Sequence, residues 1–92
     1  MVERTFTMSR KEGLHARPAA LFTRIASAFT SDISIRKGGE RGNAKSLLSI
    51  LALGIFEGNV FTVEAEGPDE REALDRIAHL IETDFSDLLR QS

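Results

Sequence analysis

The chain has 92 residues, of which 12 are basic and 14 acidic, so its net charge is −2; hydrophobic residues make up 41% of it. This length predicts a single domain, residues 1–92, with a modest core. The basic residues are spread along the chain, which gives direct nucleic-acid binding no electrostatic support. Cysteine is absent, which excludes disulfides and thiol chemistry, and two separated histidines argue against a metal site.

Membrane insertion and export have no sequence signal either. No stretch reaches the roughly 18 apolar residues that a membrane span requires. Residues 1–13 lack the apolar core and cleavage pattern of a signal peptide. We therefore expect a cytoplasmic protein with no membrane insertion.

A strand and a helix are predicted first. Residues 2–8 alternate in polarity, with Phe6 and Met8 on the inward side. A polar loop around Gly13 follows. From Ala16 to about residue 28 the apolar spacing is helical, and the predicted buried stripe is Phe22, Ile25, Ala26 and Phe29.

A hairpin is predicted next. Residues 32–37 alternate in polarity, as a half-buried strand does. Gly38 and Gly39 suit a tight turn because glycine adopts positive φ without steric cost. The partner strand is short, at residues 40–43.

A two-turn helix follows the hairpin. Ser46 is a good N-cap for it, and Gly54 is a good C-terminal stop. The segment has more apolar residues than one buried face of so short a helix can use. We expect Ile50 and Leu53 to lie in the core and the others to be at least partly exposed: Leu47, Leu48 and Leu51.

The last elements are a half-buried strand at residues 60–66 and a helix after Gly67 and Pro68. The inward positions of the strand are Phe61, Val63 and Ala65. Asp69 and Glu72 have the spacing of a capping box at the helix start. The predicted inner stripe of the helix is Leu74, Ile77, Ala78 and Ile81, extended by Phe85 and Leu88.

The predicted element order is therefore βαββαβα. Four strands with one polar face and helices on the other predict a two-layer α+β sandwich. In this sandwich a four-stranded antiparallel sheet carries two long helices and one short helix on one face. The pattern leaves the order of the strands in the sheet open, because helices interrupt them.

The segment GLHARPA at residues 13–19 is the main candidate functional site. It places His15 where a loop passes into a helix. A neutral imidazole is a usable nucleophile, and the free N–H groups of a first helical turn suit a phosphoryl dianion. Arg17 adds planar donors for phosphate oxygens, and Pro18 is tolerated in the first turn. The alternative, that His15 only caps the helix, is less consistent with its Gly, Arg and Pro neighbours.

GLHARPA, the serine-led segment NAKSLLSILALG at residues 43–54 and the element order together resemble the HPr family. These are histidine-containing phosphocarriers of the bacterial phosphoenolpyruvate-dependent sugar phosphotransferase system, and the resemblance runs from about Val2 to Asp84. It implies an open-faced β-sandwich in which enzyme I phosphorylates His15 at Nδ1, giving a pros-phosphohistidine that passes the group to an enzyme IIA domain. Arg17 would stabilise the phosphoryl group, and Pro18 would fix the helix entrance.

The resemblance also makes Ser46 the family's regulatory serine. In many Gram-positive relatives an ATP-dependent HPr kinase/phosphorylase modifies this serine, and a catabolite-control transcription factor is a possible partner. A plain N-cap contributes about 1 kcal/mol. A phosphate would be favourable at the same helix end. We hypothesise that Ser46 has both roles.

A carrier of this kind has to dock successive partners through one surface. The sequence predicts an apolar patch ringed by positive charge for that purpose. Its members are predicted to be Ala20, Arg17, Arg24, Leu47, Leu48 and Leu51.

Two further residues and three alternatives complete the interpretation. Glu12 places a carboxylate near the proposed phosphate, where relatives often have a small polar residue, and His79 reads as an ordinary helix-surface residue.

No nucleotide loop, metal constellation or catalytic triad is present, so we expect a carrier without a cofactor and no independent enzyme. The alternatives are a nitrogen-branch phosphocarrier, a dihydroxyacetone-kinase partner and a regulatory HPr-like corepressor. Asn43 and Lys45 before Ser46 favour the sugar branch, and the presence of His15 argues against pure regulation.

Overall fold

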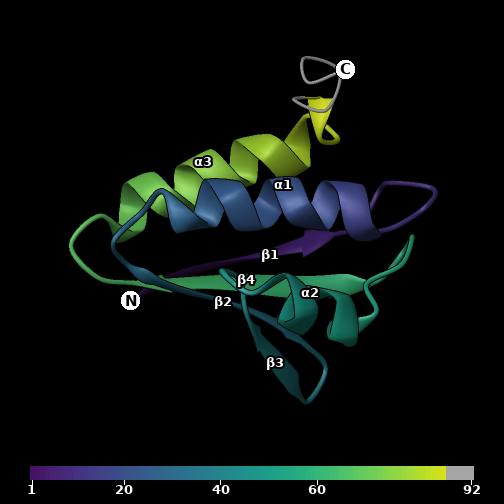
Figure 1. The fold of residues 1–92 in the computed structure, drawn as a ribbon, viewed down its shortest axis with the longest axis horizontal. Helices are drawn as coiled ribbons and strands as arrows, with labels where there is room; N and C mark the ends of the chain where they lie inside the picture. The colour runs from purple at the N-terminus through teal and green to yellow at the C-terminus, as the bar shows by residue number, and fades with distance from the viewer. Residues whose placement is uncertain (87–92) are drawn as a thin grey trace.

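The computed structural model describes residues 1–86, and its elements follow the predicted order (Figure 1). The four strands are β1 (Val2–Thr7), β2 (Asp32–Lys37), β3 (Glu40–Asn43) and β4 (Val60–Glu66). The three helices are α1 (Ala16–Ser27), α2 (Leu47–Leu53) and α3 (Glu70–Glu82). None of the helices in this part of the chain is long and apolar enough to cross a membrane.

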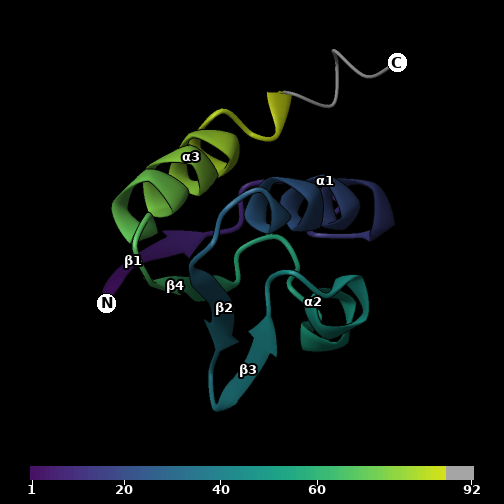
Figure 2. The ribbon, with the colours of Figure 1, turned by 60° about the vertical axis from the view of Figure 1, so that its left-hand side comes forward.

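The strands form one antiparallel sheet in the order β1-β4-β2-β3. The strand nearest the C-terminus, β4, is therefore central, with Phe61 opposite Phe6 of β1 and Val63 opposite Ile35 of β2. Figures 1 and 2 show α1 and α3 side by side over one face, with α2 beside β3. The predicted α+β class and the antiparallel sheet are confirmed.

The core lies between the sheet and the helices. Its largest fully buried side chains include Phe22 of α1, Phe61 of β4 and Ile77 of α3, as the apolar periodicities predict. In α1, however, Leu21 is buried, whereas Ile25 and Phe29 are only partly covered. The helix α1 packs against both α2 and α3, so more than one stripe of its side chains is covered, and Phe29 leaves the stripe because the helix ends at Ser27.

The central strand β4 is more buried than predicted. Thr62 and Glu64 face the side of the sheet without helices, yet both are buried. Side chains of the other strands cover them. The hydroxyl oxygens of Thr62 and of Thr5 on the neighbouring β1 lie 2.9 Å apart. Glu64 lies 3.9 Å from Arg36 on the neighbouring β2 and 2.9 Å from Arg41 on β3, the strand beyond it. The prediction of a half-buried strand is thus wrong for β4, because alternation does not reveal how many neighbours a strand has.

The predicted capping box at the start of α3 is also wrong. Asp69 is the N-cap residue, but its side chain makes no hydrogen bond to the helix. It accepts hydrogen bonds from the backbone N–H groups of Thr30 and Ser31, both at 2.9 Å, and from the Ser31 hydroxyl. The bonds from the Ser31 hydroxyl and the Thr30 N–H lower the pKa of Asp69. Glu70, instead of Glu72, reaches back to accept from Gly67 N–H at 3.1 Å.

The chain turns sharply after α3. Asp84 and Phe85 have positive φ angles of 54° and 59°, and this turn brings the Phe85 side chain back into the core at 2% exposure. Phe85 therefore adds to the core from a turn and not from the helical stripe. Leu88, predicted to extend the same stripe, lies outside the described residues.

Candidate functional site

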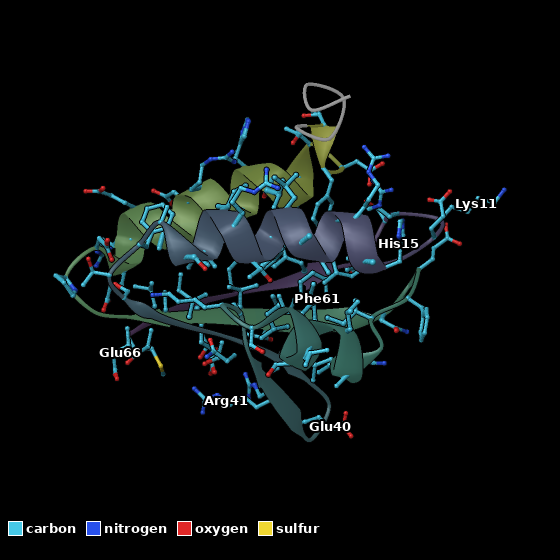
Figure 3. The ribbon with its side chains drawn as sticks, viewed as in Figure 1. Lys11, His15, Glu40, Arg41, Phe61 and Glu66 are labelled. Carbon is cyan, nitrogen blue, oxygen red and sulfur yellow. The ribbon has the colours of Figure 1, made fainter. Side chains whose placement is uncertain are left out.

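His15 occupies the N-cap position of α1 and is exposed at the end of that helix (Figure 3). Its backbone carbonyl accepts from Ala19 N–H at 2.9 Å, whereas its side chain makes no capping hydrogen bond. Within residues 1–86 the imidazole has no hydrogen-bond or ion-pair partner. The backbone of His15 thus starts the helix, and both ring nitrogens are left for other chemistry.

The loop before His15 is held against the segment that follows α2. Leu14 N–H donates to the carbonyl of Ile55 at 2.8 Å, and the Leu14 side chain is buried. Gly13 has a φ of 70°, and a Cβ there would lie 2.6 Å from the Ile55 carbonyl oxygen and 2.9 Å from Phe56 Cα. Only glycine fits both this backbone conformation and this close approach. These contacts bring the His15 end of α1 to the end of α2.

The first turn of α1 supplies free hydrogen-bond donors. The N–H groups of Ala16 and Arg17 have no acceptor within the helix, and Pro18 has no N–H to leave unpaired. No acidic residue occupies this turn. The Arg17 side chain is exposed and has no ion pair among the described residues. The helix dipole, two backbone donors and one unpaired guanidinium therefore favour an anion beside His15.

Glu12, three residues before His15, has a cationic partner that the sequence analysis did not identify. Arg10 Nη2 lies 3.8 Å from Glu12 Oε2. Its Nη1 donates to the Asp84 carbonyl at 3.5 Å, and its Cζ lies 5.7 Å from the centre of the Phe85 ring. An arginine in an irregular loop has no periodic signal, and its contacts at residues 84 and 85 are far away in sequence.

The short helix α2 presents the predicted mixture of core and surface. Ile50 and Leu53 are buried, Leu48 is 79% exposed, and Leu47 and Leu51 are 36% and 37% exposed, as predicted. On the neighbouring α1, Ala20 is partly buried and Arg24 is exposed.

An exposed aromatic residue that was not anticipated follows α2. Phe56 is 64% exposed, and its backbone lies against Gly13 of the His15 loop. Lys37 Nζ lies 5.9 Å from the centre of the Phe56 ring and donates to the Gly54 carbonyl at 2.6 Å, at the C-terminal end of α2. Phe56 escaped the sequence analysis because a single apolar residue before a turn forms no pattern.

Ser46 caps α2 as predicted. Its Oγ accepts from Ser49 N–H at 3.3 Å, and the residue is partly exposed. Two hydrogen bonds of Lys45 hold the turn before Ser46. Asn43 Oδ1 accepts from Lys45 N–H at 2.9 Å, and Lys45 Nζ donates to the Phe29 carbonyl at 2.7 Å. Ser46 therefore starts α2 from a defined turn, next to the end of α1.

Comparison with known proteins places this geometry in one family. A family profile described as "PTS HPr component phosphorylation site" matches residues 2–83. The HPr-like protein Crh of Halalkalibacterium halodurans is 45% identical over 82 residues, which cover 89% of this chain and 98% of that protein. The chain belongs to the HPr family.

Other HPr-family proteins agree in sequence and in fold. The phosphocarrier protein HPr of Vibrio cholerae is 39% identical over 82 residues, 89% of this chain and 96% of that protein. The crystal structure of HPr from Thermoanaerobacter tengcongensis matches with a TM-score of 0.90 and 48% identity, covering 92% of this chain and 96% of that one. The open-faced sandwich that the resemblance implied is thereby confirmed. The HPr-family relatives include proteins named HPr and proteins named Crh, and His15 and Ser46 both lie inside the matched range.

His79, the second histidine, is exposed on α3, as predicted for an ordinary surface residue. It lies on a different helix from His15, and nothing in residues 1–86 groups it with other metal-binding side chains. It therefore serves as a natural control for His15.

Proposed function

We propose that this chain is a cytoplasmic phosphocarrier of the sugar phosphotransferase system, accepting a phosphoryl group on His15 from enzyme I and passing it to an enzyme IIA domain. The observation that carries the proposal is the open end of α1. There an exposed, unpartnered imidazole lies at a helix N-terminus with free backbone donors and an unpaired Arg17. Membership of the HPr family supports the same role.

The transfer step needs little from the protein. The lone pair of His15 Nδ1 attacks phosphorus, a P–N bond forms, and the bond from phosphorus to the donor breaks with its electron pair. With the ring proton on Nε2, Nδ1 presents its lone pair and no general base is required. The N–H groups of Ala16 and Arg17, and the Arg17 guanidinium, would hold the phosphoryl oxygens. Pro18 fixes φ in the first turn and so keeps the entrance of the helix in place.

The exposed position of His15 suits a carrier. A phosphoryl group that has to leave again must be stabilised only moderately, because tight binding of the carrier state would slow the next transfer. A helix end that is open to solvent, with two backbone N–H groups and one guanidinium as donors, gives such moderate stabilisation. It also lets two different partners approach the same nitrogen in turn.

The docking surface would be the apolar side chains beside His15. We define the docking patch as Ala20, Arg24, Leu47, Leu48, Leu51 and Phe56. Its leucines and phenylalanine are exposed although they are apolar, and the basic side chains of α1 flank them. Exposed apolar residues with a charged rim are typical of transient protein interfaces.

Ser46 would regulate this surface. A phosphate on Oγ adds a charge of about −1.5 to −2 at the start of α2, where the helix dipole tolerates it. Its oxygens retain the capacity to accept from Ser49 N–H, so the fold should survive while the docking patch gains negative charge. The partners implied are an HPr kinase/phosphorylase and a catabolite-control transcription factor.

A second candidate function is a purely regulatory HPr-like module. The observation in its favour is the 45% identity to a protein named Crh. Phosphorylation on Ser46 without phosphorylation on His15 would favour this role. The presence of His15, and a first turn of α1 with free N–H groups and no acidic residue, support the carrier role instead.

The decisive experiment is incubation of the full chain with enzyme I and phosphoenolpyruvate, followed by intact-mass measurement. We expect one acid-labile phosphate on the native chain and on His79→Ala, and none on His15→Ala. Because both histidines are exposed, the two alanine variants remove the same group from the surface. A phosphate that persists in His15→Ala would overturn the assignment.

A further inference from the structure

Arg10 is a cation with several contacts in the loop that leads to His15. Its side chain is only 17% exposed, whereas that of its partner Glu12 is 65% exposed. The guanidinium packs over the buried Phe85 ring and donates to the Asp84 carbonyl. A cation held on two sides in this way has a defined position beside the loop.

The surface that holds Arg10 is itself rigidly built. Phe85 N–H donates to the Leu80 carbonyl at 2.8 Å, and Asp84 N–H donates to the Ile81 carbonyl at 3.0 Å. Ser9, the neighbour of Arg10, adds a hydrogen bond from its Oγ to Asp84 Oδ1 at 3.3 Å. The two positive φ angles at residues 84 and 85 are unfavourable for non-glycine residues and persist because these contacts and the burial of Phe85 maintain them.

Glu12 is the acidic residue closest in sequence to His15, and its carboxylate opposes a phosphoryl dianion by like-charge repulsion. Arg10 is its ion-pair partner in the structure. Only Lys11 separates the two residues, so the partly buried arginine restricts the positions that the exposed Glu12 carboxylate can take. Gly13 N–H donates to the Arg10 carbonyl at 3.0 Å, which ties the same arginine to the turn that leads into His15.

We propose that Arg10 is a positioning residue of the phosphoryl-acceptor site: anchored on the turn at residues 84–85, it holds and neutralises the Glu12 carboxylate, which would otherwise oppose the phosphoryl group on His15. This inference rests on the proposed phosphocarrier function. In this account Glu12 destabilises the phosphorylated form of His15, and Arg10 reduces that destabilisation. The effect of Arg10 therefore passes through Glu12 and not through a direct contact with phosphate.

The test is a double-mutant cycle on the full chain. Arg10→Ala, Glu12→Gln and the double variant are each equilibrated with enzyme I, phosphoenolpyruvate and pyruvate, and the ratio of phosphorylated to free protein is measured. We expect Arg10→Ala to lower this ratio about two- to fivefold, the range that exposed ion pairs support. In the Glu12→Gln background the same replacement should change the ratio by much less, because the carboxylate is gone.

Controls separate this effect from net charge and from folding. Arg71→Ala and Glu72→Gln make the same charge changes on the exposed surface of α3, at the end of the molecule opposite His15, and should leave the ratio unchanged. Arg10→Lys retains the charge and most of the apolar stem, so it should fold and keep a ratio close to that of the native chain. A urea titration of each variant establishes that the folded protein is compared.

The outcomes distinguish the inference from the function beneath it. A native chain that enzyme I does not phosphorylate at all overturns the carrier function, and the role of Arg10 falls with it. A native chain that is phosphorylated, with Arg10→Ala lowering the ratio equally in the presence and absence of the Glu12 carboxylate, or not at all, overturns the role of Arg10 alone. An Arg10→Lys variant as impaired as Arg10→Ala would exclude charge as the cause.

Discussion

The N-termini of α1 and α3 are built in opposite ways. At α3 the N-cap Asp69 binds the backbone of Thr30 and Ser31, and acidic residues occupy the first turn. At α1 the side chain of the N-cap residue His15 makes no hydrogen bond or ion pair within residues 1–86, and the first turn has no acidic residue. The start of α3 thus carries the protein's own carboxylates, and we call it the closed end; the start of α1 carries none, and we call it the open end. An open helix end is a potential anion site, whereas a closed one contributes stability.

The largest effect on this contrast is expected from Arg17→Ala. Losing hydrogen bonds to a charged group costs about 1.5–3 kcal/mol, which corresponds to a rate of phosphoryl transfer from enzyme I lower by roughly 10- to 150-fold. The free energy of unfolding should change by no more than about 0.5 kcal/mol, since Arg17 is exposed. Single-turnover kinetics and urea denaturation measure the two quantities. Equal losses of transfer rate in Arg17→Ala and in the control Arg71→Ala would show that the open end is not special.

Asp69→Asn tests the closed end. The pKa of Asp69 is lowered in the folded state, so its ionised form stabilises the fold above the unfolded pKa, and this contribution is lost as the pH falls through the folded pKa. The native chain should therefore be more stable than Asp69→Asn at pH 7, with a gap that narrows below about pH 4. Urea titrations at several pH values measure the gap. The transfer rate at His15 should be unchanged, and a gap that widens in acid would contradict the assignment.

Ser46 lies between these two extremes, since it caps α2 and remains partly exposed. Ser46→Ala should lower the free energy of unfolding by about 1 kcal/mol, because Ser49 N–H loses its acceptor. Ser46→Asp should retain most of that stability, since aspartate is also a good N-cap. Thermal or urea denaturation of both variants gives the comparison. Equal destabilisation by alanine and aspartate would mean that the cap contributes little.

The smallest structural effect is expected at Leu48, in the docking patch. Because this side chain is 79% exposed, Leu48→Ala should leave stability within about 0.5 kcal/mol of the native chain. The KM for phosphorylation by enzyme I should rise, by roughly fivefold if the contact contributes about 1 kcal/mol. Leu53→Ala, in the buried row of the same helix, is the matched control and should instead lose about 2–5 kcal/mol of stability. Unchanged KM in Leu48→Ala would remove this residue from the patch.

Much of the fold follows from the sequence because burial has a period. The alternation of Phe61, Val63 and Ala65 and the helical spacing of Leu74, Ile77 and Ile81 both identify the core correctly. The central place of β4 does not follow, because strand order depends on contacts between distant segments. The capping box fails at Asp69 for a related reason: its carboxylate has better partners at Thr30 and Ser31, which no local pattern reveals.

The candidate site divides in the same way. GLHARPA and Ser46 are visible as motifs, since a turn glycine, a helix start and a cap are local features. Arg10 and Phe56 are not, because each gains its position from a contact across the fold. The turn at residues 84 and 85 contains no glycine, so the sequence does not indicate its positive φ angles. Local chemistry is therefore predictable here, and its supporting contacts are not.

The central claim, that the open end of α1 holds a phosphoryl group on His15, is tested most directly by the ¹H–¹⁵N spectrum of the full chain before and after phosphorylation by enzyme I and phosphoenolpyruvate. The largest amide shifts are expected at His15, Ala16 and Arg17, with the amides of residues 70–72 at the closed end of α3 unchanged. The claim would be contradicted if phosphorylation left the amide resonances of Ala16 and Arg17 unshifted, or if the largest shifts occurred around His79.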